Sequence, residues 1–316
     1  MVYALFFLGF VLLIFGANGL VDGASSLAKR FNISDLVIGL TIVAFGTSTP
    51  ELVVSVLAGL SGKTDIAIGN VVGSNLFNSL FILGLAAILS PVNVQHNTVW
   101  KEIPLMLLAA IVLSFLVNDA LISGAATSEV TRVDGLILLS FFAVFMYYIV
   151  DMARNDPSPT EEIKPMPVWK AVLFLVLGLG GLVLGGQWIV AGAVEMARTV
   201  GMSESVIGLT IISAGTSLPE LATSVVAAYK KNSDIAIGNV VGSNIFNIFF
   251  ILGISATISP VTFNPAMNFD VIFNVIVSIF IFIFLFTGKG RRIDRWEGIV
   301  FMLAYVGYVS YLIYNQ

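Results

Sequence analysis

Long apolar runs dominate this sequence, and short clusters of charged residues, Pro or Gly separate them. Runs of this length are typical of membrane helices, because about 20 apolar residues span the hydrocarbon core of a bilayer. Transmembrane β-barrels show alternating stretches of about 10 residues instead. The pattern therefore predicts an all-α integral membrane protein with ten transmembrane helices, near residues 2–22, 36–60, 66–89, 102–118, 133–151, 168–197, 205–229, 235–258, 269–287 and 296–314.

The composition supports this class and excludes others. Hydrophobic residues make up 58% of the 316 residues and charged residues 11%, against about 45–50% and about 25% in soluble domains. A water-soluble enzyme is therefore excluded. A net charge of −4 argues against a nucleic-acid partner, and the absence of cysteine excludes thiol chemistry. The expected partner is the lipid bilayer, and we expect the protein to function as a monomer.

The loops predict the orientation, because cytoplasmic loops carry an excess of Lys and Arg. If both the N- and the C-terminus lie outside the cell membrane, the 15 basic residues divide 12 inside to 3 outside. Only Lys63, Arg132 and Arg198 fall in outer loops. The acidic, proline-containing stretch 152–167 is then a cytoplasmic linker between residues 1–151 and 168–316.

An internal repeat is the strongest signal in the chain. Residues 34–92 align with residues 203–261 at a constant offset of 169, and 37 of the 59 pairs are identical, polar residues included. Each half holds five predicted helices, so the second half must enter the membrane from the opposite side. Such inverted repeats are typical of secondary transporters, with the site at the bilayer midplane where the halves meet.

The first repeated motif is GTSTPE at Gly46–Glu51 and GTSLPE at Gly215–Glu220, inside predicted helices. Its proline lacks an N–H and clashes with the carbonyl four residues earlier, so both helices are predicted to kink and to free main-chain carbonyls. A carboxylate at membrane depth indicates a functional site, so we predict that Glu51 and Glu220 bind a cation. The nearby hydroxyls share the face of each Glu, although alone they would indicate helix packing: Thr47, Ser48, Ser55, Thr216, Ser217 and Ser224.

The second repeated motif spans Asp65–Asn78 and Asp234–Asn247 and places a polar stripe along each helix at i, i+4 and i+8. We predict that the last two positions of each stripe are ligands: Ser74, Asn78, Ser243 and Asn247. The first position, Asn70 or Asn239, fits a ligand and a structural role equally well. The donors are thus all oxygens, and the single His96 falls in a loop. Oxygen ligands suit Ca²⁺ or Na⁺ rather than soft metals, so no cofactor is expected besides transported ions.

With these motifs the chain resembles the Ca²⁺/cation antiporter superfamily, and within it the prokaryotic sodium/calcium exchangers. The resemblance spans the whole chain and implies Ca²⁺ and Na⁺ competing for one central site. Carried over by position, it implies side-chain ligands at Glu51, Thr47, Ser48, Ser74 and Asn78, and at Glu220, Thr216, Ser217, Ser243 and Asn247. It also implies carbonyl ligands at Ala44 and Ser213, and sliding of residues 2–28 and 168–198 over the other helices.

One departure concerns charge. Many sodium/calcium exchangers carry Asp at the position of Asn247, whereas both repeats here carry Asn. The site then has two formal negative charges, which leaves the coupling ion and the stoichiometry open. The expected activity is exchange of Ca²⁺ for Na⁺ by alternating access. Coupling to H⁺ or K⁺ is the alternative, a cation channel is a weaker one, and no enzymatic residue constellation can be assembled.

Overall fold

A computed structural model describes residues 2–62, 64–124, 127–155, 166–199, 213–288 and 290–314. Its helices and strands, in chain order, are α1 (Val2–Phe31), α2 (Asp35–Ile38), η1 (Gly39–Val43), α3 (Ala44–Thr47), α4 (Thr49–Leu60), α5 (Thr64–Leu76), η2 (Phe77–Ile82), α6 (Leu83–Leu89), β1 (Val92–Asn93), η3 (Thr98–Glu102), α7 (Ile103–Leu116), α8 (Asp119–Ser123), β2 (Glu129–Val130), α9 (Arg132–Asn155), α10 (Val168–Thr199), α12 (Ser213–Thr216), α13 (Leu218–Tyr229), α14 (Ser233–Ile245), η5 (Phe246–Leu252), α15 (Gly253–Ile258), β3 (Val261–Thr262), η6 (Pro265–Met267), α16 (Asn268–Phe284), β4 (Arg292–Ile293) and α17 (Arg295–Tyr314).

These helices make the chain a multi-pass membrane protein. Within the described residues, eight helices are long and apolar enough to cross a membrane, and Asp35–Thr47 with Thr49–Leu60 forms a ninth candidate that bends by 47°. They correspond to nine of the ten predicted segments. The tenth, predicted near 205–229, is described only from Ser213 onward, and residues 156–165 of the predicted linker also lie outside the described residues.

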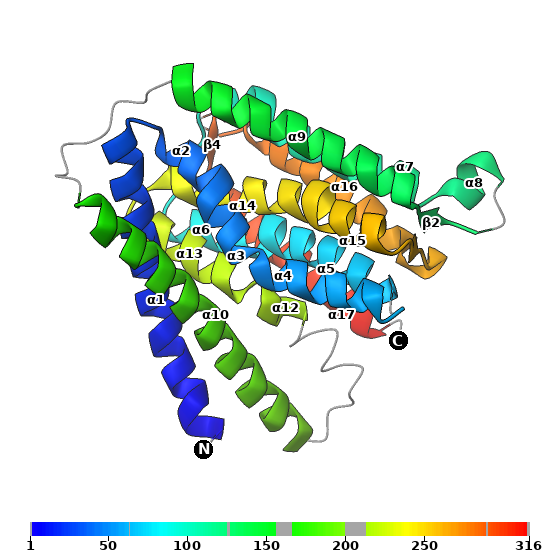
Figure 1. Ribbon diagram of the computed structural model, residues 1–316, viewed down its shortest axis with the longest axis horizontal. Helices are drawn as coiled ribbons and strands as arrows, with labels where there is room; N and C mark the ends of the chain where they lie inside the picture. Colours follow the sequence, from blue (N-terminus) through cyan, green and yellow to red (C-terminus); the bar gives the residue numbers. More distant parts are fainter. Residues whose placement is uncertain are drawn as a thin grey trace.

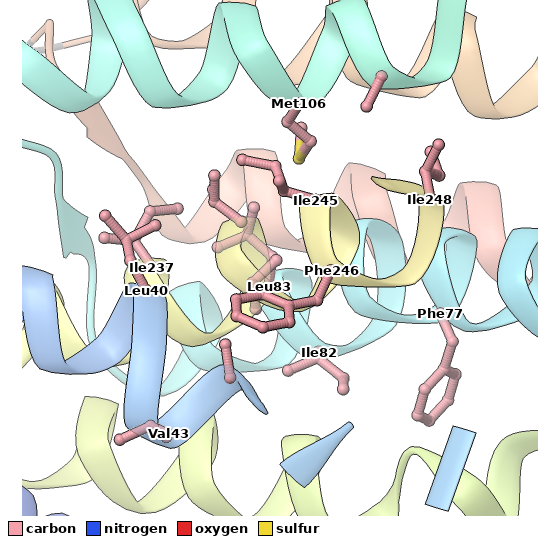
Figure 2. Close-up of a cluster of buried hydrophobic side chains, with 14 of the residues drawn as sticks. Leu40, Val43, Phe77, Ile82, Leu83, Met106, Ile237, Ile245, Phe246 and Ile248 are labelled. Atoms are coloured by element: carbon pink, nitrogen blue, oxygen red, sulfur yellow. The ribbon is translucent and has the colours of Figure 1, made fainter. Parts of the chain in front are cut away.

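Two spans form the centre of the bundle: α5–η2–α6 and α14–η5–α15. In their most apolar stretches 78% and 94% of the residues are buried, whereas the values for the other long spans are 17–39%. A small residue of α14 permits close contact with η1, since a Cβ on Gly238 would lie 3.1 Å from the Cα of Gly39. Figure 2 shows buried apolar side chains around these spans, with Leu40 drawn beside Ile237, Leu83 near Phe246, and Met106 entering from α7.

The long helices α1 and α10 lie side by side and cross the rest of the bundle at an angle (Figure 1). Glycines line their contact: a Cβ on Gly9 would lie 2.8 Å from the carbonyl of Gly185, and one on Gly16 equally close to that of Gly178. Helix α1 is longer than the predicted segment 2–22. Its last third contains Asp22 and small residues that pack against protein instead of lipid.

Two short antiparallel strand pairs join distant parts of the chain outside the helices. Strand β1 pairs with β4, and β2 pairs with β3, so each pair joins one strand from the first half of the sequence to one from the second. The two pairs lie at opposite ends of the bundle (Figure 1). Strand β1 follows α6 and β3 follows α15, so the pairs lie next to the ends of the central helices. The strands were not predicted, because two-residue strands have no hydrophobic period.

Candidate cation site

Both predicted kinks in the motif helices are present. Helix α3 ends at Thr47 and α4 begins at Thr49, with Ser48 between them at φ −81° and ψ 7°; Ser217 separates α12 from α13 at φ −90° and ψ 11°. Each motif proline is the second residue of the new helix, where its missing N–H is tolerated. Both motif glutamates therefore stand in the first turn of a helix, whose dipole favours a carboxylate.

The two glutamates are buried at the meeting point of the broken helices. Glu51 is 0% exposed and Glu220 is 1% exposed. Each is held by the serine of the opposite motif: Ser48 Oγ donates to Glu220 Oε1 at 2.9 Å, and Ser217 Oγ donates to Glu51 Oε1 at 2.8 Å. These crossed bonds bring the two repeated motifs into direct contact.

The serines of the second motif are arranged unequally. Ser74 Oγ lies 3.4 Å from Glu51 Oε1 and 3.1 Å from Ser217 Oγ, which places it within the site. The equivalent Ser243 is fully buried, and its Oγ has no hydrogen-bond partner among the described residues. The two halves thus present similar hydroxyls in different bonding states.

Asn70 and Asn239 brace the broken helices. Asn70 Nδ2 donates to Ser55 Oγ at 2.9 Å and to the main-chain oxygen of Glu51 at 3.2 Å. Asn239 does the same for Ser224 at 2.9 Å and the Glu220 main chain at 3.3 Å. Their Oδ1 atoms accept from the opposite threonines.

Those threonine bonds also cross between the motifs. Thr47 Oγ1 donates to Asn239 Oδ1 at 3.1 Å, and Thr216 Oγ1 donates to Asn70 Oδ1 at 3.4 Å. Each threonine oxygen keeps lone pairs after donating its proton. The predicted threonine ligands therefore lie beside the site with their oxygens still able to accept.

Five buried side-chain oxygens in the two motifs have no hydrogen-bond partner in the described part of the chain: Glu51 Oε2, Glu220 Oε2, Asn78 Oδ1, Asn247 Oδ1 and Ser243 Oγ. All five belong to predicted ligands. A buried polar atom left without a partner is costly, so native structures pair such atoms with protein, water or an ion. Two carboxylate oxygens, two amide oxygens and a hydroxyl form the donor set that Ca²⁺ and Na⁺ prefer.

The carbonyl positions implied by the resemblance are less open. The carbonyl of Ala44 accepts from the Ser48 N–H at 3.0 Å and lies 3.3 Å from Thr47 Oγ1. Ser213 is the first described residue of its segment. A carbonyl has two lone pairs, so Ala44 would bind an ion only by sharing or losing these contacts.

Helix α10 covers both motif glycines. A Cβ on Gly46 would lie 2.6 Å from Leu179 Cδ2, and one on Gly215 would lie 2.2 Å from Val190 Cγ2. A larger residue at either position would require the Leu179 or Val190 side chain to move.

The sequence did not indicate Asn75 and Asn244 as functional residues. Asn75 contacts the predicted ligand Asn247, and Asn244 contacts the predicted ligand Asn78. They lie one residue outside the polar stripe that selected the candidates. Their identity in both repeats was the signal that pointed to them, since an amide kept at equivalent positions of two apolar helices needs a partner. A second surprise is that Asn78 and Asn247 lie in the π-helical segments η2 and η5.

An all-helical bundle of membrane spans, with a buried oxygen-rich centre between two broken helices, defines the class as a multi-pass membrane protein of the ion-transporter type. Within that class the chain matches the family described as "Sodium/calcium exchanger protein" over residues 1–150 and 170–314. The protein belongs to the sodium/calcium exchanger family, and the resemblance to its prokaryotic members is confirmed.

Individual relatives agree. The chain is 40% identical over 319 residues to the putative antiporter CaxA of Alkalimonas amylolytica, covering 98% of this chain and 97% of that one. It is 32% identical over 345 residues to the sodium/calcium exchanger MaX1 of Methanosarcina acetivorans, covering 99% and 98%. A solved structure of the sodium-calcium exchanger NCX_Mj, soaked with 2.5 mM Na⁺ and 0.1 mM Ca²⁺, is similar with a TM-score of 0.84 and 32% identity, covering 98% and 97%.

Proposed function

We propose that this protein is a secondary active antiporter that exchanges Ca²⁺ for Na⁺ across the cell membrane by alternating access. The observation that carries the proposal is that five buried oxygens without a partner in the described chain belong to the two repeated motifs; other such oxygens, among them Glu102 Oε2 and Thr98 Oγ1, lie outside the motifs. One Ca²⁺ or two Na⁺ would balance the charges of Glu51 and Glu220. Because both ion loads use the same carboxylates, each must leave before the other binds, and this competition is what couples the two fluxes.

The proposed ligands are the residues that the sequence indicated: Glu51, Glu220, Thr47, Thr216, Ser48, Ser217, Ser74, Ser243, Asn78, Asn247 and the carbonyls of Ala44 and Ser213. The crossed hydrogen bonds between the motifs support a single site shared by both halves. We assign the halves to residues 1–151 and 168–316, with ten transmembrane helices and both termini outside.

The proposed moving part is the pair α1 and α10. The glycine contacts that join the two helices support their motion as one unit. The Leu179 and Val190 side chains of α10 lie directly on the two broken helices, so sliding of the pair would change access to the site. Neither helix supplies one of the partnerless oxygens, which leaves the ion in place while the pair moves.

A flux experiment tests the proposal. Purified protein is reconstituted into proteoliposomes, and ⁴⁵Ca²⁺ uptake is measured with an outward gradient of Na⁺, K⁺ or H⁺. We expect uptake only with the Na⁺ gradient, and none from Glu51→Gln. Uptake that follows the K⁺ or H⁺ gradient would mean that this ion, and not Na⁺, is the coupling ion. Uptake without any counter-gradient would indicate a channel and contradict antiport.

A further inference from the structure

Asn75 and Asn244 lie against each other between the central helices, one from each repeat. Both are 1% exposed, and neither is a proposed ligand. Asn78 Nδ2 donates to Asn244 Oδ1 at 3.1 Å, and Asn247 Nδ2 donates to Asn75 Oδ1 at 2.9 Å. Each of these two residues thus accepts a hydrogen bond from the proposed amide ligand of the opposite repeat.

These bonds decide which end of each ligand amide is free. An asparagine side chain ends in one acceptor oxygen and one NH₂ donor, and only the oxygen can bind a cation. The NH₂ groups of Asn78 and Asn247 are used on Asn244 and Asn75, while their Oδ1 atoms have no partner in the described chain. A rotated amide would instead present its NH₂ to the cation and repel it.

The two acceptors are themselves fixed. Asn244 Nδ2 donates to Ser79 Oγ at 2.7 Å and lies 3.4 Å from Met106 Sδ, a thioether that has no proton to donate. Asn75 Nδ2 donates to the main-chain oxygen of Asn244 at 3.3 Å. The NH₂ of each residue is therefore directed away from the ligand amide, and its Oδ1 is directed toward it.

We propose that Asn75 and Asn244 are positioning residues that turn the amide oxygens of Asn78 and Asn247 into the cation site. The proposal rests on the ion site described under the proposed function. The pair also restricts which residues can stand at positions 78 and 247. A carboxylate at position 78 or 247 would place an oxygen against the Oδ1 of Asn244 or Asn75, with no proton between them.

The test uses Asn244→Leu, which removes the acceptor and keeps a side chain of similar length. In proteoliposomes we expect the KM for Ca²⁺ to rise about tenfold, the effect of losing one hydrogen bond to a buried group, with little change in kcat. Thr223→Val is the matched control. It removes a buried hydroxyl that has no partner in the described chain, at a position where the first repeat has Val54.

The deciding step repeats Asn244→Leu in an Asn78→Asp background. A carboxylate has two equivalent oxygens, so no orienting acceptor is needed, and removing the Asn244 oxygen relieves a repulsion. We expect KM to be unchanged or lower there, the opposite of its direction in the wild type. An equal rise of KM in both backgrounds would mean that Asn244 is only structural and would overturn the proposal.

The second repeat gives an independent version, with Asn75→Leu tested alone and in Asn247→Asp. It decides the question if Asn78→Asp does not fold. A second readout is the Ca²⁺-dependent rise in melting temperature of each variant in detergent, which measures binding without transport. If wild-type protein shows this rise but no Na⁺-driven exchange, the proposed function fails. The positioning role is then still judged by the opposite directions of the effect in the two backgrounds.

Discussion

At the scale of single residues, the site depends on dividing the oxygens of each carboxylate between two tasks. Oε1 of Glu51 and of Glu220 accepts from a serine of the opposite motif, and Oε2 has no partner among the described residues. The first oxygen fixes the side chain, and the second is the one that we propose binds an ion. Two ionised carboxylates in one buried site repel each other, so the proposed site favours bound cations that neutralise both.

Position in the repeated motifs, rather than burial alone, predicts which buried carboxylates matter for transport. Glu102 is as buried as Glu220, its Oε1 accepts from the Tyr148 hydroxyl and its Oε2 also has no partner among the described residues, but it lies at the end of η3, outside the repeated motifs. We expect Glu220→Gln to remove more than nine-tenths of Na⁺-driven ⁴⁵Ca²⁺ uptake, because Ca²⁺ then keeps one uncompensated charge. Glu102→Gln should retain at least half of the wild-type rate. Equal losses in two well-folded variants would contradict the assignment of the site.

At the same scale, the sequence indicated the residues that we propose as ligands, but not how they are held. The carboxylates, hydroxyls and amides were predicted because polar groups at membrane depth stand out from an apolar background. Asn70 and Asn239 looked no different from ligands, and only the structure shows them bonded to Ser55 and Ser224. Which end of an amide faces a site depends on contacts between distant residues, and no spacing in the sequence encodes it.

At the scale of secondary-structure elements, α1 and α10 contact each other through backbone as much as through side chains. A Cβ on Gly178 would lie 2.7 Å from the Leu20 nitrogen and 2.8 Å from the Gly16 oxygen, whereas a Cβ on Gly180 meets nothing within 4 Å. The same helix therefore offers a buried glycine and an exposed one two residues apart. Comparing substitutions at these two glycines separates the effect of the contact between the helices from the effect of glycine's conformational freedom.

We therefore expect Gly178→Ala to lower the melting temperature of the detergent-purified protein, because overpacking costs roughly 1–3 kcal/mol. Gly180→Ala should leave the melting temperature unchanged or raise it slightly, since alanine favours a helix by about 1 kcal/mol over glycine. Thermal unfolding of both variants measures the difference. If Gly180→Ala is the more damaging change, α1 and α10 do not pack as described.

A charged contact ties the end of α1 to the rest of the bundle. Lys230 Nζ lies 2.6 Å from Asp22 Oδ1, with side-chain exposures of 27% and 47%. The pair joins α1 to the residue that follows α13, which carries Glu220. If α1 slides during transport, this contact must change. The ion pair therefore stabilises one of the two positions of α1 relative to the other.

We expect Asp22→Asn and Lys230→Gln to change the exchange rate by about two- to fivefold, since a partly exposed ion pair contributes roughly 0.2–1 kcal/mol. The KM for Ca²⁺ should change little at saturating Na⁺ gradients, because neither residue contacts the site. The charge-swapped double variant, Asp22→Lys with Lys230→Asp, should recover most of the wild-type rate. A double variant no faster than the slower single variant would rule out the pairing as the cause.

The elements themselves were largely predictable, because length and hydropathy alone define a membrane helix. Kinks at Ser48 and Ser217 followed from the two prolines. The π-helical turns did not, because a π turn changes hydrogen-bond register without changing the pattern of apolar residues. Two of these turns, η2 and η5, hold Asn78 and Asn247, so the unpredicted geometry lies at the proposed site.

At the scale of the whole molecule, the contacts between the two repeats follow an approximate twofold symmetry. Serine to glutamate, threonine to asparagine and asparagine to asparagine bonds each occur twice, once in each direction. The strand pairs β1–β4 and β2–β3 also join the halves. The sequence repeat anticipates this symmetry, because two copies of one motif that meet around a common axis make each contact twice.

This symmetry is not perfect, and the positions that break it can make the function of the two halves asymmetric. Ser79 accepts from Asn244, but its counterpart in the second repeat is Ile248, and Asn75 bonds to a main-chain oxygen instead. Ser74 is bonded within the site while Ser243 is not. The two halves thus hold equivalent side chains through different hydrogen bonds, so the two sides of the proposed site are unequal.

The charge of the whole site leads to a prediction about stoichiometry. With Glu51 and Glu220 as the carboxylates, one Ca²⁺ or two Na⁺ leaves the site neutral. A third Na⁺ would add an uncompensated charge, and two unit charges about 4 Å apart repel by about 4 kcal/mol at an effective dielectric constant of 20. Within the described residues, no group of three His, Cys, Asp or Glu side chains gathers to offset it. We therefore expect two Na⁺ per Ca²⁺ and no net charge movement.

The Ca²⁺ gradient that proteoliposomes reach at equilibrium, at a fixed Na⁺ gradient and with the membrane potential set by K⁺ and valinomycin, measures this stoichiometry. An electroneutral exchanger should reach the same Ca²⁺ ratio at 0 and at −100 mV. A three-to-one exchanger moves one charge per cycle, worth about 2.3 kcal/mol per 100 mV, so its Ca²⁺ ratio would change about fiftyfold. Asn247→Asp supplies a third carboxylate and should introduce that voltage dependence, most clearly when Asn75→Leu removes the oxygen that would face it. If the wild type already shows the fiftyfold change and Asn247→Asp leaves it unaltered, side-chain charge does not set the number of Na⁺ ions.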